Sequence, residues 1–135
     1  MNLTTWMPTA PLAPSEAALE ALYATGHWLY SQERYEDAQN VFRALIHVAP
    51  HDERGWLALG ACHEIEGQQD VAFELYEIAS TATYAPRCDI ARARILKRRG
   101  LEHEARHALD EVASCAESRR DRELGRLVEA ERGRP

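Results

Sequence analysis

The sequence of 135 residues lacks the features that mark membrane, secreted or nucleic-acid-binding proteins. No run approaches the roughly 18 apolar residues that a membrane span requires, and residues 1–14 have no basic start followed by an apolar stretch, so we expect no secretory signal. Asp and Glu number 22 against 16 Lys and Arg, and this net charge of −6 argues against nucleic-acid binding through a broad basic surface.

Cysteine is scarce as well, with Cys62, Cys88 and Cys115 standing far apart and forming no CxxC pair. An odd, widely spaced set is not a disulfide framework, so we expect reduced thiols in a cytosolic protein. With 45% hydrophobic and 28% charged residues, the composition is that of one globular domain.

Signatures of catalysis are also few, since the sequence has no glycine-rich phosphate loop and no Gly-x-Ser-x-Gly. One stretch, His103 to His107, matches the zinc-protease pattern H-E-x-x-H. We expect no zinc there, because Ala105 occupies a helix-packing position of the repeat described next and no third ligand follows at a recognisable spacing. The sequence therefore predicts no metal, no cofactor and no enzymatic activity.

What the sequence does contain is an internal repeat with a period of 33–34 residues. The matching pairs are Gly26 and Gly60, Ala38 and Ala72, Phe42 and Tyr76, Gly67 and Gly100, Ala72 and Ala105, and Tyr76 and Leu109. This is the period of the tetratricopeptide repeat, a helix–turn–helix unit in which small residues let two helices approach and large apolar residues fill the space between them.

The repeat predicts an all-α tetratricopeptide solenoid of three helix pairs plus a C-terminal capping helix. We expect an extended segment over residues 1–14, the three repeats over 15–117, and the capping helix and tail over 118–135. The predicted helices cover 16–31, 35–48, 53–66, 69–82, 87–99, 102–115 and 118–131.

Stacked repeats form a concave groove lined by the first helix of each pair, and this groove is the predicted binding site. Repeat positions place these residues on or beside it: Tyr23, His27, Tyr30, Tyr35, Phe42, Leu57, Ala61, Glu64 and Arg94. Aromatic rings with polar tips suit extended, proline-containing peptides. The alternative is that the tyrosines and Phe42 serve only to pack the repeats together.

Several segments resemble the class II chaperones of bacterial type III secretion, which serve hydrophobic translocator proteins. The resemblance covers residues 17–117 and is most specific at Tyr35-Glu36-Asp37-Ala38 and at Leu59-Gly60-Ala61-Cys62. It implies that an extended P-x-L-x-x-P segment of a translocator lies in the groove, and that this binding keeps the membrane-inserting translocators soluble and apart until export. The family often has an aromatic residue where this chain has His27, and a longer N-terminal helical segment used for dimerisation.

Two other functions fit the repeat. A tetratricopeptide chaperone of a needle or filament subunit would bind a partner helix rather than an extended peptide, and a general scaffold module would assemble other proteins. Self-association as a dimer is also open. Neither a nucleic-acid partner nor stable membrane insertion is expected.

Overall fold

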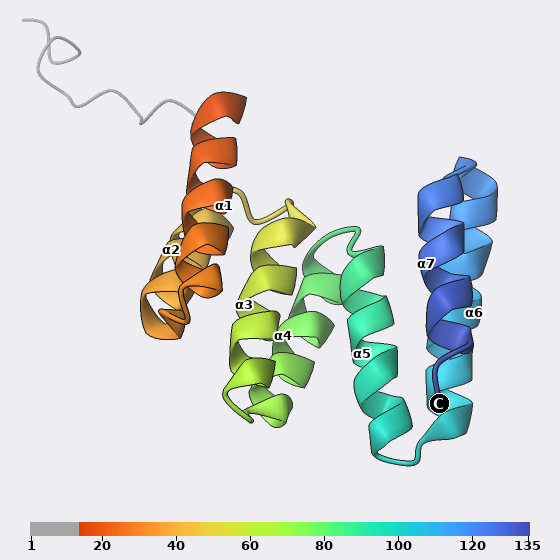
Figure 1. The fold of residues 1–135 in the computed structure, drawn as a ribbon. Coiled ribbons are helices and arrows are strands. Elements are labelled where there is room, and N and C mark those ends of the chain that lie inside the picture. The colour runs from red at the N-terminus through yellow and green to blue at the C-terminus, as the bar shows by residue number, and fades with distance from the viewer. Residues whose placement is uncertain (1–13) are drawn as a thin grey trace, which may run out of the picture.

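The computed structural model describes residues 14–135, which form seven α-helices and no strand (Figure 1). The helices are α1 (Glu16–Ser31), α2 (Tyr35–Val48), α3 (Glu53–Ile65), α4 (Gln69–Ala82), α5 (Pro86–Arg98), α6 (Glu102–Arg119) and α7 (Arg122–Arg132). This confirms the predicted all-α fold of three helix pairs and a C-terminal helix. The expected extended segment, residues 1–14, lies outside the described residues except for Pro14.

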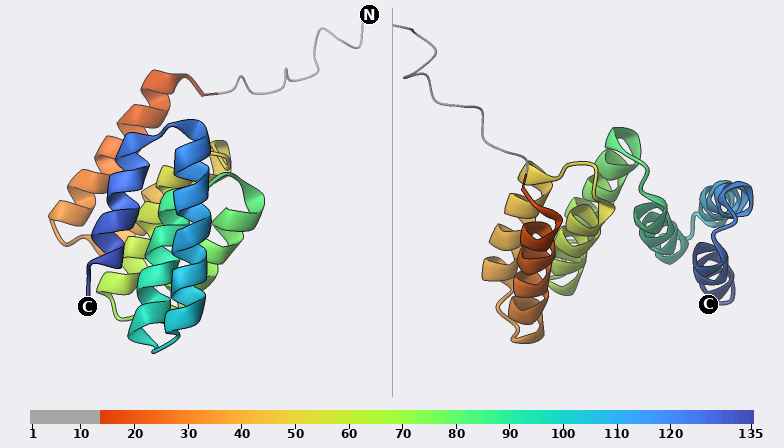
Figure 2. Two further views of the ribbon diagram at one scale, coloured as in Figure 1. Left: turned by 90° about the vertical axis from the view of Figure 1, so that its right-hand side faces the viewer. Right: turned by 90° about the horizontal axis from the view of Figure 1, so that it is seen from above.

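The helix pairs follow one another in an arc, as the two further views show (Figure 2). Within the arc, α1 contacts α3, α3 contacts α5, and α5 contacts α7, so these four helices form one continuous layer. Helices α2, α4 and α6 pack against it as the second members of their pairs. Among residues 14–135, no helix combines the length and the apolar character that a membrane crossing needs.

Each helix pair turns at one residue in the left-handed region, at φ values of 60° for Glu33, 78° for Gly67 and 76° for Gly100. After each of these residues, a backbone N–H closes the helix onto a carbonyl five residues earlier. These bonds are Arg34 to Leu29 at 3.0 Å, Gln68 to His63 at 2.8 Å and Leu101 to Leu96 at 2.9 Å. The second and third turns use glycine, which adopts this conformation without strain.

Side-chain caps mark the starts of α1 and α3. The Ser15 hydroxyl accepts a bond from the Ala18 N–H at 3.1 Å, and the Asp52 carboxylate accepts one from the Arg54 N–H at 3.0 Å. Both caps satisfy N–H groups that have no partner within the helix. Local chemistry thus fixes where α1 and α3 begin.

The repeated glycines allow an aromatic ring of the second helix to press against the backbone of the first. A Cβ added to Gly26 would lie 2.4 Å from Phe42 Cε1, and one added to Gly60 would lie 2.2 Å from Tyr76 Cε1. Both rings are only 1% exposed. The third repeat has Ala93 and the smaller Leu109 in the same core cluster, so a methyl group fits there.

The C-terminal boundary differs from the sequence prediction. Helix α6 ends at Arg119 rather than at residue 115, and α7 begins at Arg122 rather than at residue 118. Ala116 is 4% exposed and belongs to the same core cluster as Leu124 and Val128, so burial favours the additional turn of helix. Arg120 ends it with a left-handed φ of 54°.

Candidate functional site

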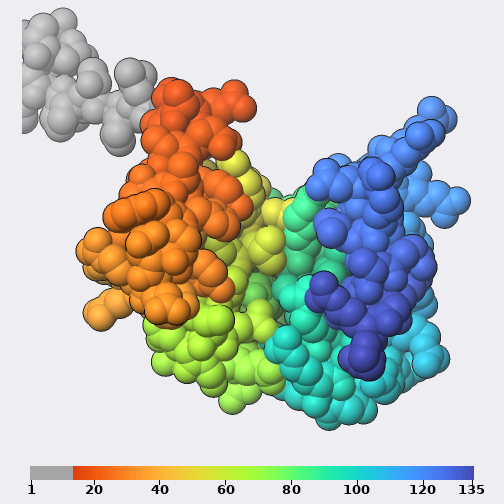
Figure 3. Space-filling view, in the orientation of Figure 1, coloured from red at the N-terminus to blue at the C-terminus, as the bar shows by residue number. Residues whose placement is uncertain are grey.

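The space-filling view is hollowed between the end formed by α1 and α2 and the end formed by α6 and α7 (Figure 3). A cavity of about 500 Å³ occupies the concave side. The side chains that line it come from four helices and the chain end after α7: Leu57, Ala61, Glu64, Tyr76, Arg87, Ile90, Ala91, Arg94, Glu123, Leu127, Ala130, Glu131 and Arg134. Because α7 forms one wall, it contributes to the site as well as ending the stack.

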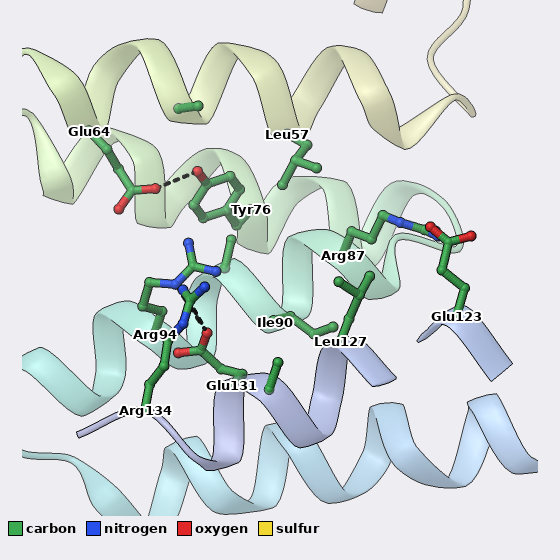
Figure 4. A pocket seen from close by; sticks show the side chains of 13 residues that line it. Leu57, Glu64, Tyr76, Arg87, Ile90, Arg94, Glu123, Leu127, Glu131 and Arg134 are labelled. Carbon is green, nitrogen blue, oxygen red and sulfur yellow. Dashed lines mark hydrogen bonds and ion pairs between the residues drawn. The ribbon is translucent and has the colours of Figure 1, made fainter. Parts of the chain in front are cut away.

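Apolar side chains form the middle of this cavity (Figure 4). Leu57 on α3 and Ile90 on α5 line it together with Leu127 on α7, and Leu127 is 39% exposed although it is a large aliphatic residue. An exposed leucine inside a concave, partly apolar site is available for contact with a partner side chain.

Tyr76 lies between the cavity and the core. Its ring is 1% exposed, and its hydroxyl donates a hydrogen bond of 2.7 Å to Glu64. Burial, followed by this bond to a carboxylate, raises the pKa of Tyr76 above its ordinary value, so the phenol stays protonated. Glu64 also pairs with Arg98 at 3.1 Å, and both contacts fix its carboxylate at the edge of the groove.

At the α5–α7 end of the cavity, a buried carboxylate gathers three cations. Glu131 is 2% exposed, with Arg94 at 3.2 Å, Arg134 at 3.4 Å and Lys97 at 3.9 Å. Lys97 also donates to the main-chain carbonyls of Glu131 and Arg134, where the C-terminal end of a helix favours a cation. These contacts hold α7 against α5.

Ion pairs one repeat period apart connect the helices that line the groove. The pairs are Glu20 with Arg54 at 2.7 Å, Glu53 with Arg87 at 3.2 Å and Glu64 with Arg98 at 3.1 Å. In each pair, the partners occupy equivalent positions 34 residues apart in consecutive repeats. We call these three pairs the ion-pair ladder.

The aromatic residues predicted for the groove lie on α1 and α2 and are not among the residues that line the cavity. The rings of Tyr23 and His27 stand edge to face with centroids 4.5 Å apart, and those of Tyr30 and Tyr35 do so at 5.3 Å. The Arg54 guanidinium lies 4.8 Å from the Tyr23 ring centroid, a cation–π contact from the neighbouring helix α3.

The structure divides the predicted site residues into two groups. Leu57, Ala61, Glu64 and Arg94 line the cavity together. The other five, which we call the aromatic cluster, lie on α1 and α2 as two contacting sets: Tyr23 with His27 and Phe42, and Tyr30 with Tyr35. Tyr23, Tyr30 and Tyr35 are partly exposed and His27 is exposed. Phe42 is 1% exposed and supports the cluster from within the core.

Sequence reasoning missed the contributions of Tyr76, Leu127 and Glu131 to the cavity. It treated Tyr76 as a packing residue only, and it had no means of placing α7 on the concave side. The available signal for α7 was the presence of opposite charges slightly more than one period apart, Arg87 with Glu123 and Arg94 with Glu131, which pair α5 with α7.

The residues that raised the possibility of catalysis lie away from this cavity. His103 and His107 are exposed on α6, and within residues 14–135 no three His, Cys, Asp or Glu side chains are grouped to hold a metal ion. Ala105 between them is 1% exposed and packs in the core.

Burial raises the pKa of the Cys62 thiol to about 11, so this thiol is protonated near neutral pH.

Comparison with known proteins identifies relatives of this arrangement, although no family model matches the sequence. The low calcium response locus protein H of Yersinia pestis is 35% identical over 96 residues, which are 70% of this chain and 57% of that protein. This chain therefore spans a little over half the length of that curated relative.

Solved structures agree with the sequence comparison. The Yersinia enterocolitica type III secretion translocator chaperone SycD superposes with a TM-score of 0.73 at 31% identity, covering 86% of this chain and 88% of that one. SycD in complex with a peptide of the translocator YopD gives a TM-score of 0.63 at 30% identity, covering 87% and 95%.

Proposed function

This chain belongs to the family of type III secretion translocator chaperones, and we propose that it binds an extended segment of a hydrophobic translocator in its concave groove. In this role it keeps the translocator soluble in the bacterial cytoplasm before export. The proposal includes no catalytic step and no cofactor.

The observation that carries the proposal is the groove itself. Leu57, Ile90 and Leu127 present apolar surface inside a cavity of about 500 Å³. Helix α1, which carries the Tyr23 and His27 rings, packs beside α3 in the same layer. An extended segment with spaced apolar residues can place one of its anchors in such a cavity, whereas a helix requires one continuous apolar stripe. SycD forms a complex with a peptide of the translocator YopD, which supports a translocator segment as the partner of this chain.

A co-expression pull-down tests the proposal. This chain serves as bait, and the preys are the hydrophobic translocators and the needle subunit encoded by the same organism. We expect a translocator to be retained in the soluble fraction. Retention of the needle subunit alone would favour the needle-chaperone function, and retention of neither would favour a general scaffold module.

Substitution of Tyr23 and Tyr30 by alanine locates the binding surface. We expect client affinity to fall by about 2–3 kcal/mol for the double variant, or roughly 30- to 150-fold, on the scale of interface hot spots. Isothermal titration calorimetry measures the loss, and circular dichroism confirms unchanged helicity.

The matched control for this pair is Tyr84→Ala. Tyr84 is 42% exposed and stacks under Arg119 at 3.8 Å, away from the groove-lining residues. Its removal should leave client affinity unchanged. Equal losses in the control and the double variant would argue that the groove tyrosines have no specific role.

A further inference from the structure

A second, smaller cavity adjoins the apolar one where α5 meets the residues that follow α7. It has a volume of about 220 Å³, and we call it the basic pocket because four of its six lining residues are basic: Arg94, Lys97, Arg98, Glu131, Arg134 and Pro135. Three of these residues, Arg94, Glu131 and Arg134, also line the cavity of about 500 Å³. The two cavities therefore share a wall, and a partner in the groove can reach both.

Positive charge in the basic pocket exceeds the negative charge that the fold places beside it. Glu131 is its acidic lining residue, and three of the cations lie within 4 Å of this one carboxylate: Arg94, Lys97 and Arg134. The fourth, Arg98, pairs with Glu64 at 3.1 Å. Four cations thus face two carboxylates, and this local excess attracts an anionic group of a partner.

The donors that can hold such an anion are accessible. The side chain of Arg94 is 34% exposed, and that of Arg134 is 58% exposed. Within residues 14–135, the Nη groups of Arg94 donate to no protein acceptor, and its hydrogen bond to Glu131 comes from Nε. Figure 4 shows both guanidinium groups in the space between Glu131 on α7 and Glu64 on α3. A guanidinium with free N–H groups can bind a carboxylate through a pair of parallel hydrogen bonds.

The basic pocket lies one helical turn away from the apolar part of the groove. Ile90 lines the apolar cavity, and Arg94 stands one turn further along the same face of α5. One such step of four residues advances about 6 Å along a helix, a distance that about two residues of an extended chain also cover. A client segment that follows α5 with an apolar residue at Ile90 therefore brings a residue about two positions away to Arg94.

We propose that the basic pocket binds an acidic side chain of the extended client, an Asp or Glu close in sequence to the apolar residue that enters the neighbouring cavity. The inference rests on the proposed function, since it adds a chemical requirement to the same partner. The apolar contact supplies affinity, and the ion pair fixes the position of the segment along the groove. A segment with a basic residue at that position is disfavoured, because it would meet like charges.

Calorimetric titration with matched peptides tests this inference. The probe is a synthetic peptide of the translocator segment retained in the co-expression experiment, acetylated and amidated so that only its side chains carry carboxylates. Each Asp or Glu is replaced in turn by Asn or Gln. We expect one replacement to lower affinity for the wild-type chain about fivefold at about 50 mM salt. The loss should shrink at about 500 mM salt, because salt screens a partly exposed ion pair.

The double variant Arg94→Gln/Arg134→Gln assigns the effect to the basic pocket. In this variant the same peptide replacement should change affinity by less than about twofold, because the cations that the acid meets are gone. The control is Arg126→Gln, which removes a cation of α7 that lines neither cavity and should keep the full loss. Circular dichroism confirms folding. Should the double variant unfold, Arg134→Gln alone serves the comparison, because Glu131 then retains Arg94 and Lys97.

The outcomes separate the inference from the proposed function. If the peptide binds but contains no acidic residue, or if no replacement weakens binding more than about twofold, the inference is overturned and the chaperone function stands. A loss that persists unchanged in the folded arginine variant also overturns it, because the acid then acts elsewhere. If no translocator segment binds the wild-type chain, the proposed function fails and the inference fails with it.

Discussion

Replacing Gly60 with alanine should destabilise this protein even though alanine favours helices. The new Cβ would lie 2.2 Å from Cε1 of Tyr76 and 2.5 Å from its Cζ, whereas carbon atoms normally approach to about 3.5–4.0 Å. The ring must therefore move by more than about 1 Å. This movement is costly, because the Tyr76 ring is 1% exposed and its hydroxyl is held by Glu64 at 2.7 Å.

The expected magnitude follows from three opposing effects. Overpacking a core costs about 1–3 kcal/mol, and loss of a hydrogen bond to a charged group costs about 1.5–3 kcal/mol. Exchanging glycine for alanine in a helix returns about 1 kcal/mol. We therefore expect a net loss of about 1.5–5 kcal/mol in the free energy of unfolding, measured by urea denaturation with circular dichroism.

Two further variants make this prediction specific. Gly125→Ala on α7 is the control, because no atom lies within 4 Å of its added Cβ, and it should stabilise the chain by up to about 1 kcal/mol. The double variant Gly60→Ala/Tyr76→Leu reproduces the Ala93 and Leu109 pair of the third repeat. It should lose at least about 1 kcal/mol less than the two single variants together. A Gly60→Ala variant as stable as wild type would refute the close-packing argument.

Two other predictions concern charge and backbone conformation. Arg87→Ala should cost about 1–3 kcal/mol at neutral pH, because it leaves the largely buried Glu53 carboxylate without its cation. Burial already raises the pKa of Glu53, so acidification should protonate this carboxylate and reduce the stability difference between wild type and Arg87→Ala. Urea unfolding of both proteins at several pH values measures this difference, and a difference that grows as the pH falls would contradict the prediction. Glu33→Gly should stabilise the chain by about 0.5–1 kcal/mol, because Glu33 has a φ of 60°. Thermal melting should shift upward by a few degrees, and a lower melting temperature would contradict the strain assigned to this turn.

The sequence predicted the parts of the fold that local chemistry determines. Residues 16–31, 35–48 and 69–82 form helices with the predicted bounds, because caps, turn residues and the hydrophobic repeat all act within about one period of the chain. The boundary between α6 and α7 differed, because burial of Ala116 against Leu124 depends on how the last helix returns to the stack.

The site was predictable to a similar extent. Repeat positions brought Leu57, Ala61 and Arg94 to one cavity, since equivalent residues of stacked repeats face the same side. Glu131 was not predictable in this way. Its burial arises where α7 packs on α5, and a charged residue near the end of a helix ordinarily indicates a solvated surface.

The ion-pair ladder also determines the order in which the repeats can stack. The contact of Gly26 with Phe42 and that of Gly60 with Tyr76 are nearly identical, so apolar packing alone does not distinguish one repeat from another. The ladder does, because its partners stand at equivalent positions and carry opposite charges. A repeat placed beside a copy of itself would bring like charges together, within one chain or between two, and this repulsion disfavours exchange of repeats between molecules.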